Sequence, residues 1–141
     1  MEKVSEKNSV INILFVGLIS VLYGLCIGAL VFAVSSVFSV FIFFGSYLTG
    51  RFMLKYLSYY TTFHNLLAGF YALLCYLSYM GILIFLLLLQ AGFLKPGLIG
   101  GITFGVICRF FLANMGIIDW VILILMPISA FMYMHYRGSF R

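Results

Sequence analysis

Long apolar runs without a charged residue dominate the pattern of hydrophobic and polar positions along the chain. No charged side chain occurs at positions 9–50 or 65–94. A membrane-spanning helix needs about 20 consecutive apolar residues, and both runs are longer than that. At 1.5 Å per residue the first run would form a helix of about 60 Å, twice the ~30 Å hydrocarbon core of a bilayer. We therefore expect the first run to fold into a helical hairpin.

Clusters of small polar, glycine and proline residues divide the chain into five expected spans. Breaks are predicted by "AVSSVFS" at 33–39, "QAGFLKPG" at 90–97 and "ANMG" at 113–116. The expected spans are 10–32, 36–54, 66–90, 97–113 and 118–136, and Pro127 is expected to kink the last one. The fourth segment is short and rich in glycine. The alternative is therefore a re-entrant segment, which gives four spans and both termini on one side.

The amino-acid composition places these elements in a membrane. Hydrophobic residues make up 65% of the chain, charged residues 8%, and the mean hydropathy is +1.23. Soluble domains are about half apolar and a quarter charged. We predict an all-α, polytopic transmembrane helical bundle that forms a single domain over residues 1–141.

The net charge of +5 changes this picture little, because the basic residues are scattered between apolar blocks. Without a basic run or stripe, no nucleic-acid partner is expected, and membrane lipids are the expected contacts. With four spans, Arg137 and Arg141 join the basic residues on the N-terminal side, and the charge bias between the two sides sharpens. The three cysteines lie inside apolar segments with no CxxC spacing, so no metal or other cofactor is expected.

Three basic residues are the candidate binding residues. Arg51 and Lys55 lie one helical turn apart, before Tyr56. They are either an interfacial anchor or a site for an anionic headgroup, since Arg offers phosphate a bidentate fork and Lys a point charge. Arg109 lies about 12 residues into its expected span, roughly 18 Å along a regular helix. It is either a structural anchor, with Asp119 as a candidate ion-pair partner, or a functional site.

Two sets of glycines recur at helical spacing. One set is Gly17, Gly24 and Gly28 in the first span, and the other is Gly97, Gly101 and Gly105 in the fourth. Small residues on one helical face allow the backbones of two helices to approach closely in lipid. The glycine faces are therefore predicted to pack helices, either within one molecule or across the seam of a homo-oligomer.

A short string recurs at the ends of the second and fourth expected spans. "GRFML" stands at 50–54 and "CRFFL" at 108–112. Because the chain contains few arginines, this coincidence raises the hypothesis of a duplicated two-helix hairpin. Internal repeats of this kind recur in transporter folds.

With these strings, the layout resembles the GtrA family of small membrane proteins over residues 15–118. "FVGLIS" at 15–20 is similar to the string that opens the family's first span, although the family's asparagine and aromatic–Thr–Phe ending follow neither arginine. The resemblance implies a four-span protein of the cytoplasmic (inner) membrane of a bacterium that moves polyprenyl-phosphate-linked sugars. Arg51 and Arg109 would be the matching basic positions.

The leading functional hypothesis is binding or translocation of an anionic lipid-linked substrate, with Arg51, Lys55 and Arg109 holding phosphate. The sequence carries no paired intramembrane carboxylates and no motif of nucleophilic catalysis, so no enzyme activity is expected. One alternative is a non-catalytic accessory or assembly subunit of a larger membrane complex, since the glycine-rich hairpins are also similar to small assembly proteins encoded beside rotary ATP synthases. A small oligomeric channel is the other alternative.

Overall fold

The computed structural model describes residues 2–56, 61–90, 109, 112–113 and 115–139. Its elements are α1 (Glu2–Ala33), the 3₁₀ helix η1 (Ser36–Phe43), α2 (Phe44–Tyr56), α3 (Thr62–Gln90) and α5 (Ile117–Ser139). All of these elements are helices, which confirms the predicted all-α class for the part of the chain that is described.

Four of the helical segments are long and apolar enough to cross a membrane. They are Val10–Ala33, Val37–Tyr56, Thr62–Gln90 and Ile117–Gly138. The expected count of five is therefore slightly too high for the described residues, and the alternative count of four fits them. The predicted span over 97–113 lies outside the described residues, apart from positions 109, 112 and 113.

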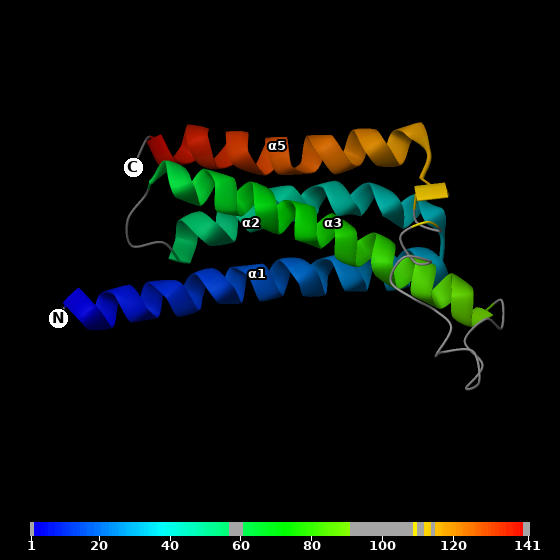
Figure 1. The fold of residues 1–141 in the computed structure, drawn as a ribbon, viewed down its shortest axis with the longest axis horizontal. Helices are drawn as coiled ribbons and strands as arrows, with labels where there is room; N and C mark the ends of the chain where they lie inside the picture. Colours follow the sequence, from blue (N-terminus) through cyan, green and yellow to red (C-terminus); the bar gives the residue numbers. More distant parts are fainter. Residues whose placement is uncertain (1, 57–60, 91–108, 110–111, 114, 140–141) are drawn as a thin grey trace.

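The four spans run up and down as an antiparallel bundle (Figure 1). Helices α2 and α3 pack against each other, and both also pack against α1 and α5. Both ends of the chain lie at the same end of the bundle in Figure 1, which we call the terminal end, and the opposite end is the distal end. This arrangement matches the topology expected for four spans.

The first hairpin turns at the predicted place. Helix α1 ends at Ala33, and Ser35 then adopts an extended backbone and caps η1. The Ser35 side chain accepts a hydrogen bond from the Val37 amide at 3.3 Å, so it satisfies a donor that the start of a helix leaves without a partner. The second span therefore begins as a 3₁₀ helix and continues as α2.

The interior contains two apolar clusters, one toward each end of the bundle. The cluster toward the terminal end consists of Val16, Met53, Ala68, Tyr71, Ala72, Ala130 and Met134. The second cluster consists of Ile27, Ile42, Cys75, Tyr76, Tyr79, Met80 and Met126. Large apolar side chains such as Leu14, Leu18 and Phe70 are about half exposed on the outside, as lipid-facing positions require.

The glycines of α1 face α3 within the same molecule. A Cβ atom at Gly24 would lie 2.1 Å from the Cys75 carbonyl oxygen, and one at Gly28 would lie 2.8 Å from the Tyr79 carbonyl oxygen. At Gly17 the neighbour is the Tyr71 ring, at 2.8 Å. The α1 glycine face is therefore covered by α3, while Gly97, Gly101 and Gly105 lie outside the described residues.

Helices α3 and α5 both begin with a side chain that reaches back to the preceding backbone. The Thr61 amide donates to His64 Nδ1 at 3.1 Å, and the Gly116 amide donates to Asp119 Oδ2 at 2.9 Å. Both contacts follow the logic of a capping box, in which the third helical residue satisfies the amide before the helix. Asp119 also accepts a hydrogen bond from Tyr76 Oη at 3.2 Å, which ties α5 to α3.

Candidate functional site

The structure brings together two of the three predicted binding residues. Arg51 and Lys55 are both exposed on α2, which leads toward the terminal end. Arg109 is exposed and precedes α5 by eight positions, and α5 begins at the distal end (Figure 1). We therefore treat Arg109 apart from Arg51 and Lys55.

The expected ion pair between Arg109 and Asp119 is also not formed, although the structure describes both residues. The Asp119 carboxylate instead accepts the hydrogen bonds of Tyr76 and Gly116. Asp119 thus has a structural explanation, as a helix cap and an interhelical contact.

Arg51 and Lys55 belong to a stripe along the outer face of α2 and the last residue of η1, which we call the α2 stripe. It consists of Phe43, Phe44, Tyr47, Arg51 and Lys55, all exposed. Spacings of three and four residues place these side chains on one side of a helix. The opposite face of α2, formed by Gly45, Ser46, Thr49, Gly50 and Met53, is buried against the bundle.

Aromatic rings surround the two cations of the stripe. Arg51 Nη1 donates to Tyr47 Oη at 3.2 Å, and the Tyr47 ring meets the Tyr133 ring edge to face, with their centroids 5.2 Å apart. Lys55 Nζ lies 5.6 Å from the centroid of the Tyr56 ring, within range of a cation–π interaction. Arg51 and Lys55 are therefore each in contact with the neutral side chain of a tyrosine.

The register between α1 and α2 determines how deep the stripe lies. The side-chain oxygens of Ser20 and Thr49 are 2.8 Å apart, so these two residues are at the same level. The apolar run of α1 begins at Val10, after the polar residues at 7–9, and the ten residues from Val10 to Ser20 rise about 15 Å. Arg51 is two residues closer to the terminal end than Thr49, which places its Cα about 12 Å inside the level of Val10.

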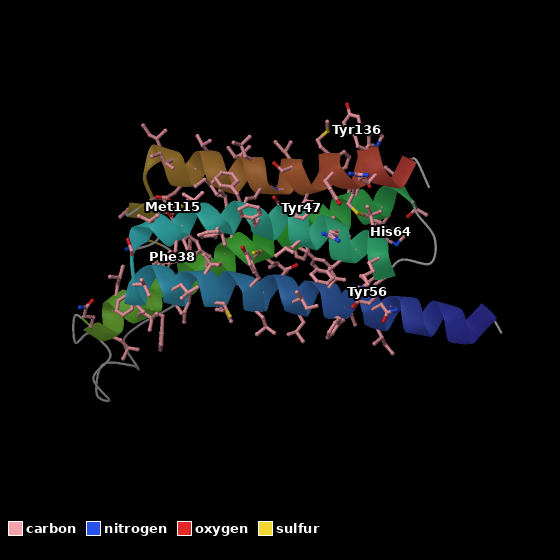
Figure 2. All side chains as sticks on the ribbon, turned by 180° about the vertical axis from the view of Figure 1, so that it is seen from behind. Phe38, Tyr47, Tyr56, His64, Met115 and Tyr136 are labelled. Carbon is pink, nitrogen blue, oxygen red and sulfur yellow. The ribbon has the colours of Figure 1, made fainter. Side chains whose placement is uncertain are left out.

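The side chain of Arg51 points further inward from that level. In an α-helix each Cα–Cβ bond tilts toward the N-terminus, and the N-terminus of α2 lies on the distal side of Arg51. Its partner Tyr47 is one turn deeper and lies about midway along the bundle in Figure 2. Arg51 therefore lies about 12 Å nearer the bundle centre than Val10, and its hydrogen bond is directed further toward the centre.

An apolar hollow adjoins the deep end of the α2 stripe. It has a volume of about 350 Å³ and is lined by Phe43, Phe44 and Tyr47. Tyr47 joins this hollow to Arg51, because its ring lines the hollow and its hydroxyl accepts the arginine's hydrogen bond. From the terminal end inward, the stripe thus presents two cations, a phenol and an apolar surface.

Sequence reasoning missed Tyr47 as a member of this site. The signal was present, because Tyr47 and Arg51 are four residues apart and side chains at that spacing meet on a helix. Tyr133, which supports the Tyr47 ring from α5, carried no comparable signal. Its contact depends on how α2 and α5 pack.

Two other features of the described residues do not add to this site. A second groove of about 380 Å³ lies between α3 and α5, and its lining side chains, among them Leu66, Phe70, Phe131 and Met132, are apolar. No group of three or more His, Cys, Asp or Glu side chains that could hold a metal ion occurs among the residues described.

The fold and the composition together define a small polytopic α-helical protein whose four described spans are suited to a membrane. No family model, no curated protein and no solved structure matches the chain. The resemblance to the GtrA family therefore stays a prediction, and the function has to be argued from the α2 stripe.

Proposed function

We propose that this protein binds the phosphate group of an anionic membrane lipid on the α2 stripe. The observation that carries the proposal is the position of Arg51, which is exposed and about 12 Å nearer the bundle centre than Val10, where the apolar run of α1 begins. A charge at the centre of a bilayer costs about 2.5–3.5 kcal/mol on insertion scales, so an ionisable residue at such depth favours a functional role.

The hydrogen bonding of Arg51 supports an anionic ligand. A guanidinium group has five N–H donors, and the hydrogen bond that the structure gives it goes to the neutral hydroxyl of Tyr47. The carboxylate of α5, Asp119, accepts hydrogen bonds from Tyr76 and Gly116. The remaining donors of Arg51 suit the bidentate hydrogen bonding that phosphate oxygens accept.

The order of groups along the stripe matches the order of a charged headgroup and a hydrocarbon chain in a lipid. Lys55 and Arg51 supply positive charge toward the terminal end, and the hollow at Phe43, Phe44 and Tyr47 supplies an apolar wall closer to the bundle centre. A phosphate bound at the two cations would leave its hydrocarbon chain beside that wall. Arg109 is left out of this proposed site because it precedes α5, which begins at the distal end. Translocation remains an implication of the GtrA-like resemblance alone.

The proposal is tested by measuring which lipids stay with the purified protein. Wild-type protein and the variants Arg51→Gln, Lys55→Gln and Arg137→Gln are extracted in mild detergent, and bound phospholipid is quantified by native mass spectrometry. Arg137 is the matched control, because it is an exposed cation in the last turn of a different helix, α5. We expect Arg51→Gln to lose most of the bound anionic lipid and Arg137→Gln to retain it. Equal retention by Arg51→Gln and wild type would overturn the proposal.

A further inference from the structure

We infer that the lipid held on the α2 stripe carries a phosphomonoester, a phosphate with no further headgroup attached. The inference rests on the proposed function and specifies the chemical class of its ligand. Two features of the site lead to it, the number of cations and the depth of Arg51.

The charge of the site matches a phosphomonoester. Arg51 and Lys55 place two positive charges one turn apart on the same helical face, an arrangement that by itself destabilises a helix. A phosphomonoester carries a charge of about −1.5 to −2 at pH 7 and offers three acceptor oxygens. A phosphodiester, with a single negative charge, would leave a net positive charge within the apolar layer, where charge interactions are weakly screened.

The depth of the site disfavours a larger headgroup. A phosphate bound to Arg51 would lie nearer the bundle centre than the start of the apolar run of α1, since the Cα of Arg51 is about 12 Å further in than Val10. The alcohol of a phosphodiester lipid would then be drawn in beside aromatic rings. Burying a polar group without hydrogen-bond partners is unfavourable. A phosphomonoester has no such group beyond the phosphate.

The surroundings of the two cations fit this argument. Tyr56 stacks on Phe52 with ring centroids 6.2 Å apart, and meets the edge of Phe15 at 6.2 Å. Together with the Tyr47–Tyr133 pair, these rings give the cations a largely apolar frame. Because the surrounding rings offer few polar contacts, Arg51 and Lys55 are the main groups that bind the ligand. The site is therefore expected to distinguish lipids mainly by the charge of their headgroups.

The test compares two lipids with identical acyl chains and different headgroups. Protein is reconstituted into nanodiscs of phosphatidylcholine containing either phosphatidic acid, the phosphomonoester probe, or phosphatidylglycerol, the phosphodiester probe. Lipids retained after detergent extraction are quantified for wild type, Arg51→Gln, Lys55→Gln and the Arg137→Gln control. Arg51→Lys is added as a variant that keeps the positive charge, and circular dichroism verifies that each variant is folded.

We expect wild type to retain several times more phosphatidic acid than phosphatidylglycerol. Lys55→Gln is expected to reduce that preference toward equality, while Arg137→Gln preserves it and Arg51→Lys keeps part of it. If wild type retains both lipids equally, or prefers phosphatidylglycerol, and Arg51→Gln still lowers retention, the phosphomonoester inference is wrong and the proposed lipid site stands. If folded Arg51→Gln retains both lipids as wild type does, the proposed site itself is wrong.

Discussion

A contact between two small hydroxyl side chains shows the level at which Arg51 lies along the bundle. Ser20 on α1 and Thr49 on α2 are both buried, and their oxygens are 2.8 Å apart. A hydrogen bond from Tyr23 Oη of α1 to the Phe41 carbonyl of η1 joins the same two spans nearer the distal end. A shift of α2 by one turn toward the terminal end would move Arg51 about 5 Å further from the bundle centre.

A double-mutant cycle on Ser20 and Thr49 measures this contact. Interhelical hydrogen bonds in membrane proteins couple by about 0.6 kcal/mol on average and by up to about 1.7 kcal/mol. We therefore expect Ser20→Ala and Thr49→Ala to be non-additive by roughly that amount in unfolding from mixed micelles. Ser20 and Thr49 also lie within hydrogen-bond distance of carbonyls of their own helices, at Val16 and Gly45. Ser78, whose hydroxyl donates to Leu74 of its own helix, is therefore the control for that intrahelical bond. If the coupling free energy of Ser20 with Thr49 is no larger than that of Ser78 with Thr49, the register of α1 against α2 is contradicted.

At the scale of the helices, close backbone contact between α1 and α3 supplies the main interface. Gly24 and Gly28 allow the carbonyl groups of Cys75 and Tyr79 to approach α1 closely. In lipid such proximity matters, because no hydrophobic force drives helices together and dispersion contacts have to supply the attraction. Because α3 covers the α1 glycine face, this face is not available to dock onto a partner protein. The alternative function as an accessory subunit therefore has one argument fewer.

Two glycine substitutions separate this packing role from helix propensity. A Cβ at Gly24 would lie 2.1 Å from a backbone oxygen, whereas a Cβ at Gly81 would meet nothing within 4 Å. We expect Gly24→Ala to lower the unfolding free energy by about 1–3 kcal/mol through overpacking. The matched Gly81→Ala change should be neutral or stabilising, because alanine favours helix. Equal unfolding midpoints for the two variants would show that α1 and α3 are not this close.

At the scale of the whole molecule, most of the basic residues that the structure describes lie toward one end. Lys3 and Lys7 lie in the first turns of α1, while Lys55 and Arg137 lie in the last turns of α2 and α5. All of these turns are at the terminal end (Figure 1). Since positive residues near span ends favour the cytoplasmic side, this end is expected to face the cytoplasm.

Cysteine accessibility tests this topology. Single cysteines are placed at Ser5 and Ser139 in a background without the native cysteines, and intact cells are treated with a membrane-impermeant thiol reagent. We expect both positions to be protected in intact cells and labelled after the membrane is opened. Labelling of only one position in intact cells would place the termini on opposite sides and exclude the four-span arrangement.

The sequence predicted the elements better than the site. The uncharged runs indicated the spans, and the serines at 35 and 36 indicated the first turn, because charge and turn chemistry are local properties. The register of α1 against α2 is not local, since apolar helices slide past each other with little change in pattern. The sequence therefore left open whether Arg51 is an interfacial anchor or a phosphate site, and its level in the bundle follows from the contact between Ser20 and Thr49.

Contact between Arg51 and a lipid phosphate can be measured by solid-state nuclear magnetic resonance. Protein labelled with ¹⁵N in its arginine side chains is reconstituted into bilayers containing phosphatidic acid, and dipolar coupling between ¹⁵N and the lipid ³¹P is recorded. Arg109, Arg137 and Arg141 also carry the label, so each spectrum is compared with that of Arg51→Gln and of Arg137→Gln. Our account predicts a guanidinium–phosphorus coupling that Arg51→Gln removes and Arg137→Gln leaves in place. A coupling pattern unchanged by Arg51→Gln would contradict it.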